Sequence, residues 1–265
     1  DMNRNLTVSV VAILVVAVTA VTIQKLTVLD DYSPSEKPEL NLSEVPKLVM
    51  AFYHPWYGNI TGPTGKWKNW NLNNHKPDEF ISPGRRDLAT ANYPFVGPYD
   101  NMDPWLIRWH IGLALEAGID VFVMVGIKYH EANIEYMMDL AENEELGMKF
   151  CFLIECQHHY SSQEIKSWLS HSIQKYGNRS SYFKVQNLPV IFTFGSGRYS
   201  AQAWEGILDE IRKEGQNLLL FGDTTKNEYA EVFDGLQHYS SVGWIYNNYS
   251  IPHRYEFIAE RAMNH

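Results

Sequence analysis

The sequence has few basic residues and no stretch in which they cluster. It holds 22 lysines and arginines against 31 aspartates and glutamates, so its formal net charge is -9 at pH 7. Proteins that hold the phosphate backbone of a nucleic acid do so with clustered lysines and arginines. We therefore expect no nucleic acid among the partners of this protein.

Cysteine is also scarce, with Cys151 and Cys156 as the two in the chain. Both fall in one predicted strand, so their odd spacing points them to opposite faces, with Cα atoms roughly 16 Å apart. That separation is too large for a disulfide. We expect both to be buried apolar residues.

Motifs for nucleotides and metals are missing as well. No GxGxxG or Walker-type loop follows a predicted strand, which argues against a nucleotide-binding sheet. A metal-dependent hydrolase would have to use His54, His158, His159 and His238 as ligands. No HxH or HExxH spacing in the sequence supports such a metal site. We therefore expect no metal and no other cofactor.

The start of the chain differs in composition from the rest. Leu6 to Ile23 is an apolar run whose only polar members are Ser and Thr, between Arg4 and Lys25. Its length is that of a membrane span, and the basic residue before it favours a type II orientation. Val18-Thr19-Ala20 also fits a cleavage site, so a secretory signal peptide is the alternative. Either interpretation predicts that the remaining chain lies outside the cytoplasm, where the Asn-x-Ser/Thr sequons would be glycosylation sites.

We divide the chain into a signal-anchor or transmembrane segment at 1–25, a linker at 26–46 rich in proline and acidic residues, and a folded domain at 47–265. In the domain, apolar strands alternate with amphipathic helices. Strands are predicted at 47–52, 119–125, 148–155, 188–194, 218–223 and 235–239, and helices at 104–117, 133–146, 162–176, 201–214 and 228–233. Near-continuous apolar strands of this kind indicate a parallel sheet, in a (β/α)8 barrel or a doubly wound fold.

Polar or aromatic side chains close nearly every predicted strand, which favours the barrel because active sites of barrels lie at the carboxyl ends of the strands. The strongest cluster follows the first strand, where Tyr53, His54, Trp56 and Tyr57 precede Gly58. Such rings stack on sugars while their polar atoms meet hydroxyls. The predicted glycan-binding residues are Tyr53, His54, Tyr57, Glu155, Asp223, His238 and Tyr239.

Each of these residues also has a purely structural interpretation. Asp223 could cap the turn that follows it, Glu155 could be half of an ion pair, and His238 could be a core imidazole. The recurrence of such residues at successive strand ends, and not any one of them, favours a binding site.

Several motifs, in order from about residue 48 to 245, resemble glycoside hydrolase family 99, the endo-α-1,2-mannosidase and endo-mannanase type. The matching stretches are AFYHPWYG at 51–58, GPYD at 97–100, DP at 103–104, RWH at 108–110, AGID at 117–120, IE at 154–155, KYG at 175–177, LPV at 188–190 and FDG at 233–235. Members of this family are (β/α)8 barrels, and the eukaryotic members are type II Golgi proteins.

The resemblance implies a retaining, metal-independent glycosidase that cuts within α-mannoside chains of a glycan. In the family, one carboxylate deprotonates the 2-hydroxyl of the sugar, which attacks the anomeric carbon, and a second serves as acid and then base. By position, Glu155 matches a carboxylate at the sugar site, Tyr53 and Tyr57 match aromatic residues of the entrance motif, and Tyr239 matches a tyrosine near the reacting sugar.

The sequence departs from the family pattern in two places. The Trp-Trp-Gly loop after the second strand is replaced by Met124-Val125-Gly126-Ile127-Lys128-Tyr129, and the catalytic Glu-Trp-x-Glu-Gly-Thr segment is absent. The carboxylates of 133–145 fall at helical spacing, which predicts a solvated helix face. We therefore assign no catalytic residue.

Six βα units are predicted where a barrel has eight, and the sequence stops within a predicted helix after Pro252. We expect an incomplete sequence of a glycosidase. The alternative is a carbohydrate-binding protein without catalysis on the same scaffold.

Overall fold

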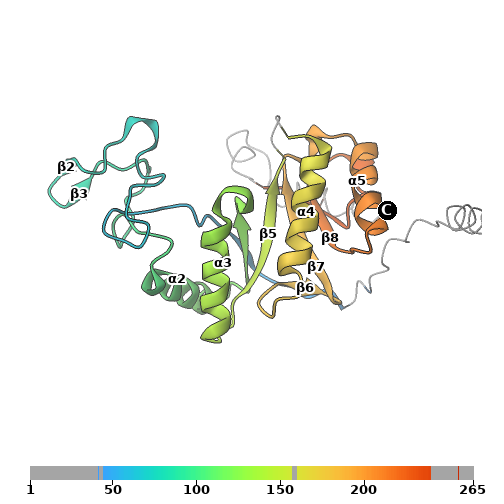
Figure 1. Cartoon of the computed structure of the whole chain (residues 1–265), viewed down its shortest axis with the longest axis horizontal. Coiled ribbons are helices and arrows are strands. Elements are labelled where there is room, and N and C mark those ends of the chain that lie inside the picture. Colours follow the sequence, from blue (N-terminus) through green and yellow to red (C-terminus); the bar gives the residue numbers. More distant parts are fainter. Residues whose placement is uncertain (1–40, 42–43, 157–159, 240–255, 257–265) are drawn as a thin grey trace, which may run out of the picture. The chain divides into compact units, whose positions relative to one another are not determined.

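A computed structural model describes residues 41, 44–156, 160–239 and 256 (Figure 1). The predicted membrane or signal segment, nearly all of the predicted linker up to residue 43, and the predicted helix after Pro252 apart from Glu256 lie outside these residues. Among the helices described, none has both the length and the apolar character needed to cross a bilayer.

The centre of the domain is a parallel sheet. Its strands run in the order β1 (Met50–Tyr53), β4 (Val121–Val125), β5 (Lys149–Glu155), β7 (Leu188–Phe194), β8 (Leu219–Asp223) and β9 (Gly235–Gln237), with the two-residue β6 (Lys184–Val185) antiparallel to β7. This order follows the sequence without the reversal that defines a doubly wound sheet. The predicted parallel sheet is confirmed, and its order is that of a barrel wall.

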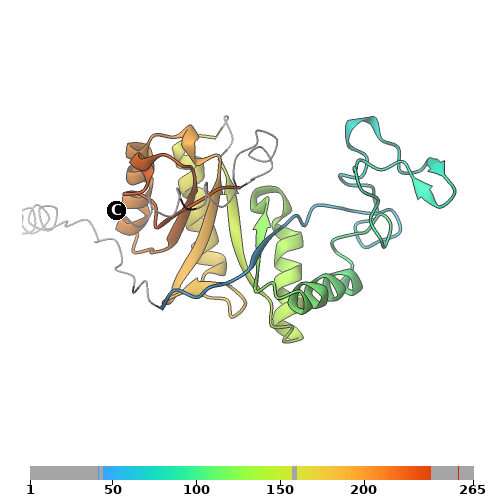
Figure 2. The ribbon, with the colours of Figure 1, turned by 180° about the vertical axis from the view of Figure 1, so that it is seen from behind.

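Four helices connect these strands: α2 (Pro104–Glu116), α3 (Ile127–Asn143), α4 (Ser162–Tyr176) and α5 (Ala201–Lys213). Figures 1 and 2 show α3, α4 and α5 on one face of the sheet. Side chains satisfy the first backbone amides: Asp103 accepts from Trp105, Ser200 accepts from Ala203, and Ser161 forms a reciprocal capping box with Glu164. The predicted start of α2 at Asp103-Pro104 is confirmed.

Two helix predictions need correction. Helix α3 begins at Ile127 and not at 133, because Gly126 adopts a left-handed φ of 82° and turns β4 directly into the helix. The predicted helix at 228–233 is only a 3-10 turn, η4 (Asn227–Tyr229). On α2, Ile111 is buried, whereas Leu113 is 45% exposed.

The hydrophobic core lies between the sheet and these helices. Phe150 and Phe152 of β5 are fully buried, and the ring of Phe152 packs edge-on against Tyr176 of α4, 5.1 Å between centroids. Cys151 and Cys156 are buried and free, as predicted.

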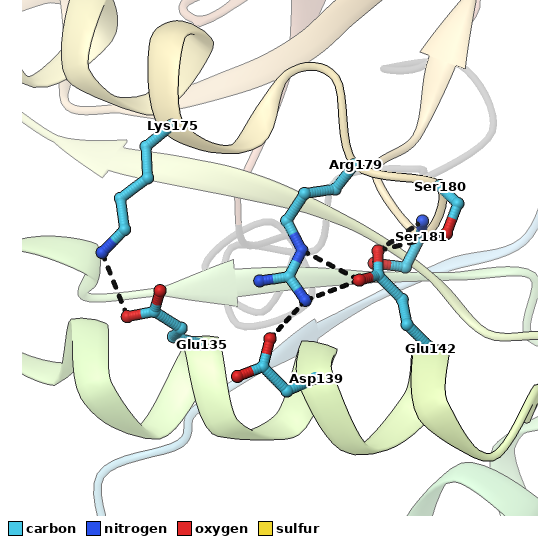
Figure 3. A network of polar contacts seen from close by, with 7 residues as sticks. All are labelled: Glu135, Asp139, Glu142, Lys175, Arg179, Ser180 and Ser181. Carbon is cyan, nitrogen blue, oxygen red and sulfur yellow. Dashed lines mark hydrogen bonds and ion pairs between the residues drawn. The ribbon is translucent and has the colours of Figure 1, made fainter.

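Ion pairs join α3 to α4 and to the turn that follows it (Figure 3). Lys175 Nζ lies 3.0 Å from Glu135, and Arg179 Nη2 lies 2.6 Å from Asp139 and 2.7 Å from Glu142. The carboxylates of α3 are therefore not simply a solvated face, as their spacing alone had suggested. They are the α3 half of an electrostatic contact between two helices.

The segment between β1 and α2 is mostly irregular, but it contains a 3-10 turn, η2 (Leu72–Asn74), and a hairpin of β2 (Phe80–Ser82) and β3 (Arg85–Arg86). Asp100 organises it from inside by accepting hydrogen bonds from the backbone and hydroxyl of Thr64. A side chain at Gly62 would meet Asp100 Oδ2 at 2.5 Å, which explains the glycine. The segment touches the start of α3 through Lys68, whose Nζ lies 3.2 Å from His130 Nδ1.

Candidate functional site

One face of the sheet carries carboxylates and rings at the carboxyl ends of its strands. Partners in register on parallel strands point to the same face, and residues two apart share that face. The pairs Phe52–Val123, Val123–Cys151 and Glu155–Phe194 therefore place Phe52, Glu155 and Phe194 on one side. This is the side opposite Phe152, whose ring faces α4. Asp223 shares it, because Phe192 pairs with Phe221.

Tyr239 lies between two rings of this face. Its centroid is 4.8 Å from that of Phe52 on β1 and 4.6 Å from that of Phe194 on β7. Phe52 and Phe194 are each 36% exposed, so the three rings form a partly open apolar surface. We call Phe52, Phe194 and Tyr239 the aromatic shelf; it could stack on one face of a sugar ring.

Two carboxylates lie beside the aromatic shelf. Asp223 accepts the backbone N–H of Gly195 at 3.1 Å and that of Tyr239 at 3.2 Å, so it holds the loops after β7 and β9. Burial, together with the nearby charges of Glu155 and Asp223, raises the pKa of Tyr239. The phenol is protonated at neutral pH already at its ordinary pKa of 10, so it can donate a hydrogen bond. His238 Nδ1 is 4.0 Å from Asp223 Oδ1, so the expected Glu155, Asp223, His238 and Tyr239 all come together.

Tyr53 lies on the other face of the sheet. Its hydroxyl is 2.9 Å from His110 Nδ1 of α2 and accepts from Asn101 Nδ2 at 3.0 Å. Its ring stacks on Phe122, and burial raises its pKa. The structure thus separates Tyr53 from Glu155 and Asp223, with which we expected it to line a site, and places it where β1 meets α2.

His54 and Tyr57 belong to the loop that follows β1. The His54 ring stacks on Trp56 with centroids 4.4 Å apart, and its buried Nδ1 has no hydrogen-bond partner in the described part of the chain. Burial lowers the pKa of His54, so the imidazole is neutral at physiological pH. Tyr57 stacks on Trp70 at 4.0 Å and meets Tyr99 edge-on, which makes it part of the packing of this loop.

A small pocket adjoins Glu155 at the ends of β4 and β5. Lys128 and Tyr129 from the first turn of α3 line it, together with Tyr160 and Trp168. Sequence reasoning named Lys128 and Tyr129 as residues after a strand but did not include them in the site. It did not include Tyr160, Phe52 or Phe194 either. The available signal was that Phe52 and Phe194 are aromatic residues that end predicted strands.

A metal centre has no support in the residues described, which contain no group of three His, Cys, Asp or Glu side chains placed to hold an ion. His158 and His159 lie outside the described residues.

A family model described as Glycosyl hydrolase family 99 matches residues 44–239. Similar curated proteins include the glycoprotein endo-alpha-1,2-mannosidase of Rattus norvegicus, 27% identical over 203 residues, which cover 66% of this chain and 43% of the relative. The Mus musculus protein of the same name is 24% identical over 254 residues, which cover 81% of this chain and 54% of the relative. The chain thus spans about half the length of these relatives.

Among solved structures, the GH99 endo-alpha-mannosidase from Bacteroides thetaiotaomicron is similar, with a TM-score of 0.61 and 25% identity. The match covers 73% of this chain and 61% of that chain.

Proposed function

Because the chain belongs to glycosyl hydrolase family 99, we propose that the protein acts on mannose-containing glycans, as a glycosidase that cuts internal α-mannosidic linkages of the endo-α-1,2-mannosidase type. The relatives and the solved structure named above carry endo-mannosidase names, which supports this substrate class. Retention at the anomeric carbon and independence of metal are parts of the same proposal, as is a (β/α)8-type barrel of which this chain supplies about six βα units.

The observation that carries the proposal is the composition of one sheet face. Glu155 and Asp223 lie beside the aromatic shelf, and a sugar needs both: rings for its C–H face and charged acceptors for its hydroxyls. In this proposal the apolar face of a mannose unit lies on the shelf, and Glu155 accepts hydrogen bonds from its hydroxyls. Asp223 holds the loops that carry the shelf.

We assign these residues to binding and not to bond cleavage. A retaining glycosidase uses two carboxylates with separate roles, and the Glu-Trp-x-Glu-Gly-Thr segment that would supply them is absent from this sequence. A carbohydrate-binding protein without catalysis is therefore the second candidate, and the same observation favours it.

The test uses the full chain and an α-1,2-linked mannotetraose, which has an internal linkage, with binding measured by calorimetry and cleavage by chromatography of the products. Glu155→Gln should weaken binding about tenfold, the loss of one charged hydrogen bond. The control is Glu205→Gln, which removes an exposed carboxylate on α5 and should leave the affinity for the sugar unchanged. Binding with cleavage would establish the glycosidase, whereas binding without cleavage would establish the glycan site and fit both candidates, because the Glu-Trp-x-Glu-Gly-Thr segment is absent from this sequence. No binding, or equal effects of the two substitutions, would refute the proposed site.

We further propose that the domain lies outside the cytoplasm, held by residues 1–25 as a type II anchor, in the Golgi lumen if the source is eukaryotic, or secreted if that segment is cleaved. Asn178 provides a marker, because it is exposed in the sequon Asn178-Arg179-Ser180. When the protein is produced in eukaryotic cells and treated with an enzyme that removes N-glycans, its electrophoretic mobility should increase. Asn178→Gln should reduce this increase. Protease sensitivity of the domain in sealed microsomes would contradict the proposal.

A further inference from the structure

Lys128 occupies an unusual position at the edge of the proposed site. It lies in the first turn of α3, which the non-helical φ of -128° at His130 sets apart from the rest of the helix.

Two tyrosines form a cradle around the ammonium group. Lys128 Nζ lies 3.7 Å from the ring centroid of Tyr160 and 5.6 Å from that of Tyr129, within cation–π range. The two phenols share a hydrogen bond of 2.5 Å between their oxygens, and Tyr160 is 8% exposed. The hydroxyl of Tyr199 holds the Tyr160 carbonyl at 2.5 Å. The cradle thus fixes the position of an ammonium group that would otherwise move on a flexible side chain.

The ammonium group also differs from the two cations of the contact between α3 and α4. Lys175 and Arg179 of the α3–α4 contact each pair with carboxylates at 2.6 to 3.0 Å. No carboxylate of the described residues lies within ion-pair distance of Lys128, whose ammonium group lies over the rings of Tyr129 and Tyr160. A positive charge that the fold orders but does not neutralise, in a protein of net charge -9, points to a negative partner from outside.

Lys128 and Glu155 line the same small pocket, so a ligand that reaches both has to suit an ammonium group and a carboxylate. An ammonium group only donates hydrogen bonds and a carboxylate only accepts them. A sugar with an acidic ester satisfies both, with hydroxyls toward Glu155 and the ester toward Lys128. We propose that Lys128, Tyr129 and Tyr160 form a subsite for an anionic substituent, a phosphate or sulfate ester, on the glycan bound at Glu155. This inference rests on the proposed glycan function and adds the substrate class.

The experiment compares three probes on the full chain: α-1,2-mannobiose, its 6-phosphate and its 6-sulfate, with affinities measured by calorimetry at two salt concentrations. The wild-type chain should bind at least one of the esters about tenfold more tightly than the neutral sugar, a ratio that falls as salt rises. The separate phosphate and sulfate arms identify which ester is the ligand. Lys128→Met, which keeps the packing on the rings and removes the charge, should abolish the ratio.

Arg198 provides the matched control. It is exposed in the 3-10 turn η3 (Ser196–Arg198) after β7, with no ring beneath its guanidinium group in the part of the chain that is described. Arg198→Met removes the same charge and should leave the ratio unchanged. Lys128→Arg keeps a cation over Tyr160 and should retain the preference, which guards against a Lys128→Met protein that fails to fold.

Equal affinity of the wild-type chain for neutral and charged probes would overturn the subsite while the glycan function stands. An equal loss of the preference for the charged probe in Arg198→Met and Lys128→Met would also overturn the subsite. The preference would then depend on the net charge of the protein and not on the position of Lys128. Binding of none of the probes would overturn the glycan function and the subsite together.

Discussion

A step of one residue along β1 separates two kinds of side chain. Phe52 belongs to the aromatic shelf, and Tyr53 faces α2 and His110. Both were visible in the sequence as aromatic residues at the end of a strand, and Tyr53 was the more attractive candidate because of its hydroxyl. The alternation of side chains along a strand decides which face of the sheet a residue occupies, whether or not its side chain is chemically suited to bind a sugar.

At the residue scale, the aromatic shelf predicts a difference between two substitutions of Tyr239. Tyr239→Phe keeps the ring between Phe52 and Phe194, so affinity for an α-1,2-mannobiose should fall by less than about threefold, the effect of one modest hydrogen bond. Tyr239→Ala removes the stacking ring and should weaken binding by about tenfold or more. Calorimetric titration of both proteins checks this. A loss as large for phenylalanine as for alanine would assign the contribution to the hydroxyl instead.

At the scale of elements, the turn from β4 into α3 depends on Gly126. Its left-handed φ of 82° disfavours any side chain, and a Cβ there would lie 2.9 Å from Cδ2 of His130. Gly126→Ala should therefore destabilise the protein by roughly 1–2 kcal/mol. Urea unfolding measures the effect. Gly206→Ala provides the control, because Gly206 lies inside α5 with open space around it and should gain slightly in helix propensity.

The contact between α3 and α4 predicts how stability depends on acid (Figure 3). Burial alone would raise the pKa of Glu142, but hydrogen bonds from Arg179 and Ser181 outweigh it and lower the pKa from 4.5 to about 2. Glu131, held by His171, Tyr176 and Lys175, is also lowered to about 2. A folded-state pKa below the unfolded value stabilises the protein above pH 4.5, and this contribution is lost as the pH falls toward 2.

Glu142→Gln should remove part of this pH dependence and cost roughly 1–3 kcal/mol at pH 7, because Arg179 loses a charged partner. Urea unfolding at pH 7 and between pH 2 and 4.5 measures both effects. Glu205→Gln on exposed α5 should leave the acid profile as in the unmodified protein. A stability that stays constant from pH 4.5 to 2 would contradict the assignment.

At the scale of the whole molecule, stability should decrease from the centre of the sheet to its ends. β5 and β7 each pair with a neighbour on both sides, while β1 and β9 end the strand path in the described part of the chain. Backbone amides in β5 and β7 should therefore exchange with deuterium most slowly, and those in β1 and β9 fastest. Mass spectrometry of exchanged peptides checks the order. Protection of β1 equal to that of β5 would show that something further covers its open edge.

Two features could be predicted well from sequence because their signals are local. The bounds of β7 and α4 agree with the prediction. β-Branched and aromatic residues mark β7, and a capping box at Ser161 marks the start of α4. The start of α3 could not be predicted so closely. From sequence alone, a glycine that joins a strand directly to a helix cannot be distinguished from a glycine within a loop.

The sequence by itself determined the alternation of strands and helices, the family resemblance and the chemistry available at the strand ends. Only the tertiary structure decided which of those residues meet. It brought Tyr239 to Phe52, nearly two hundred residues earlier in the chain, and it placed Lys128 over Tyr160. The physical reason is that local sequence sets the period of a strand, whereas the face that stays open depends on how neighbouring strands and helices pack against it.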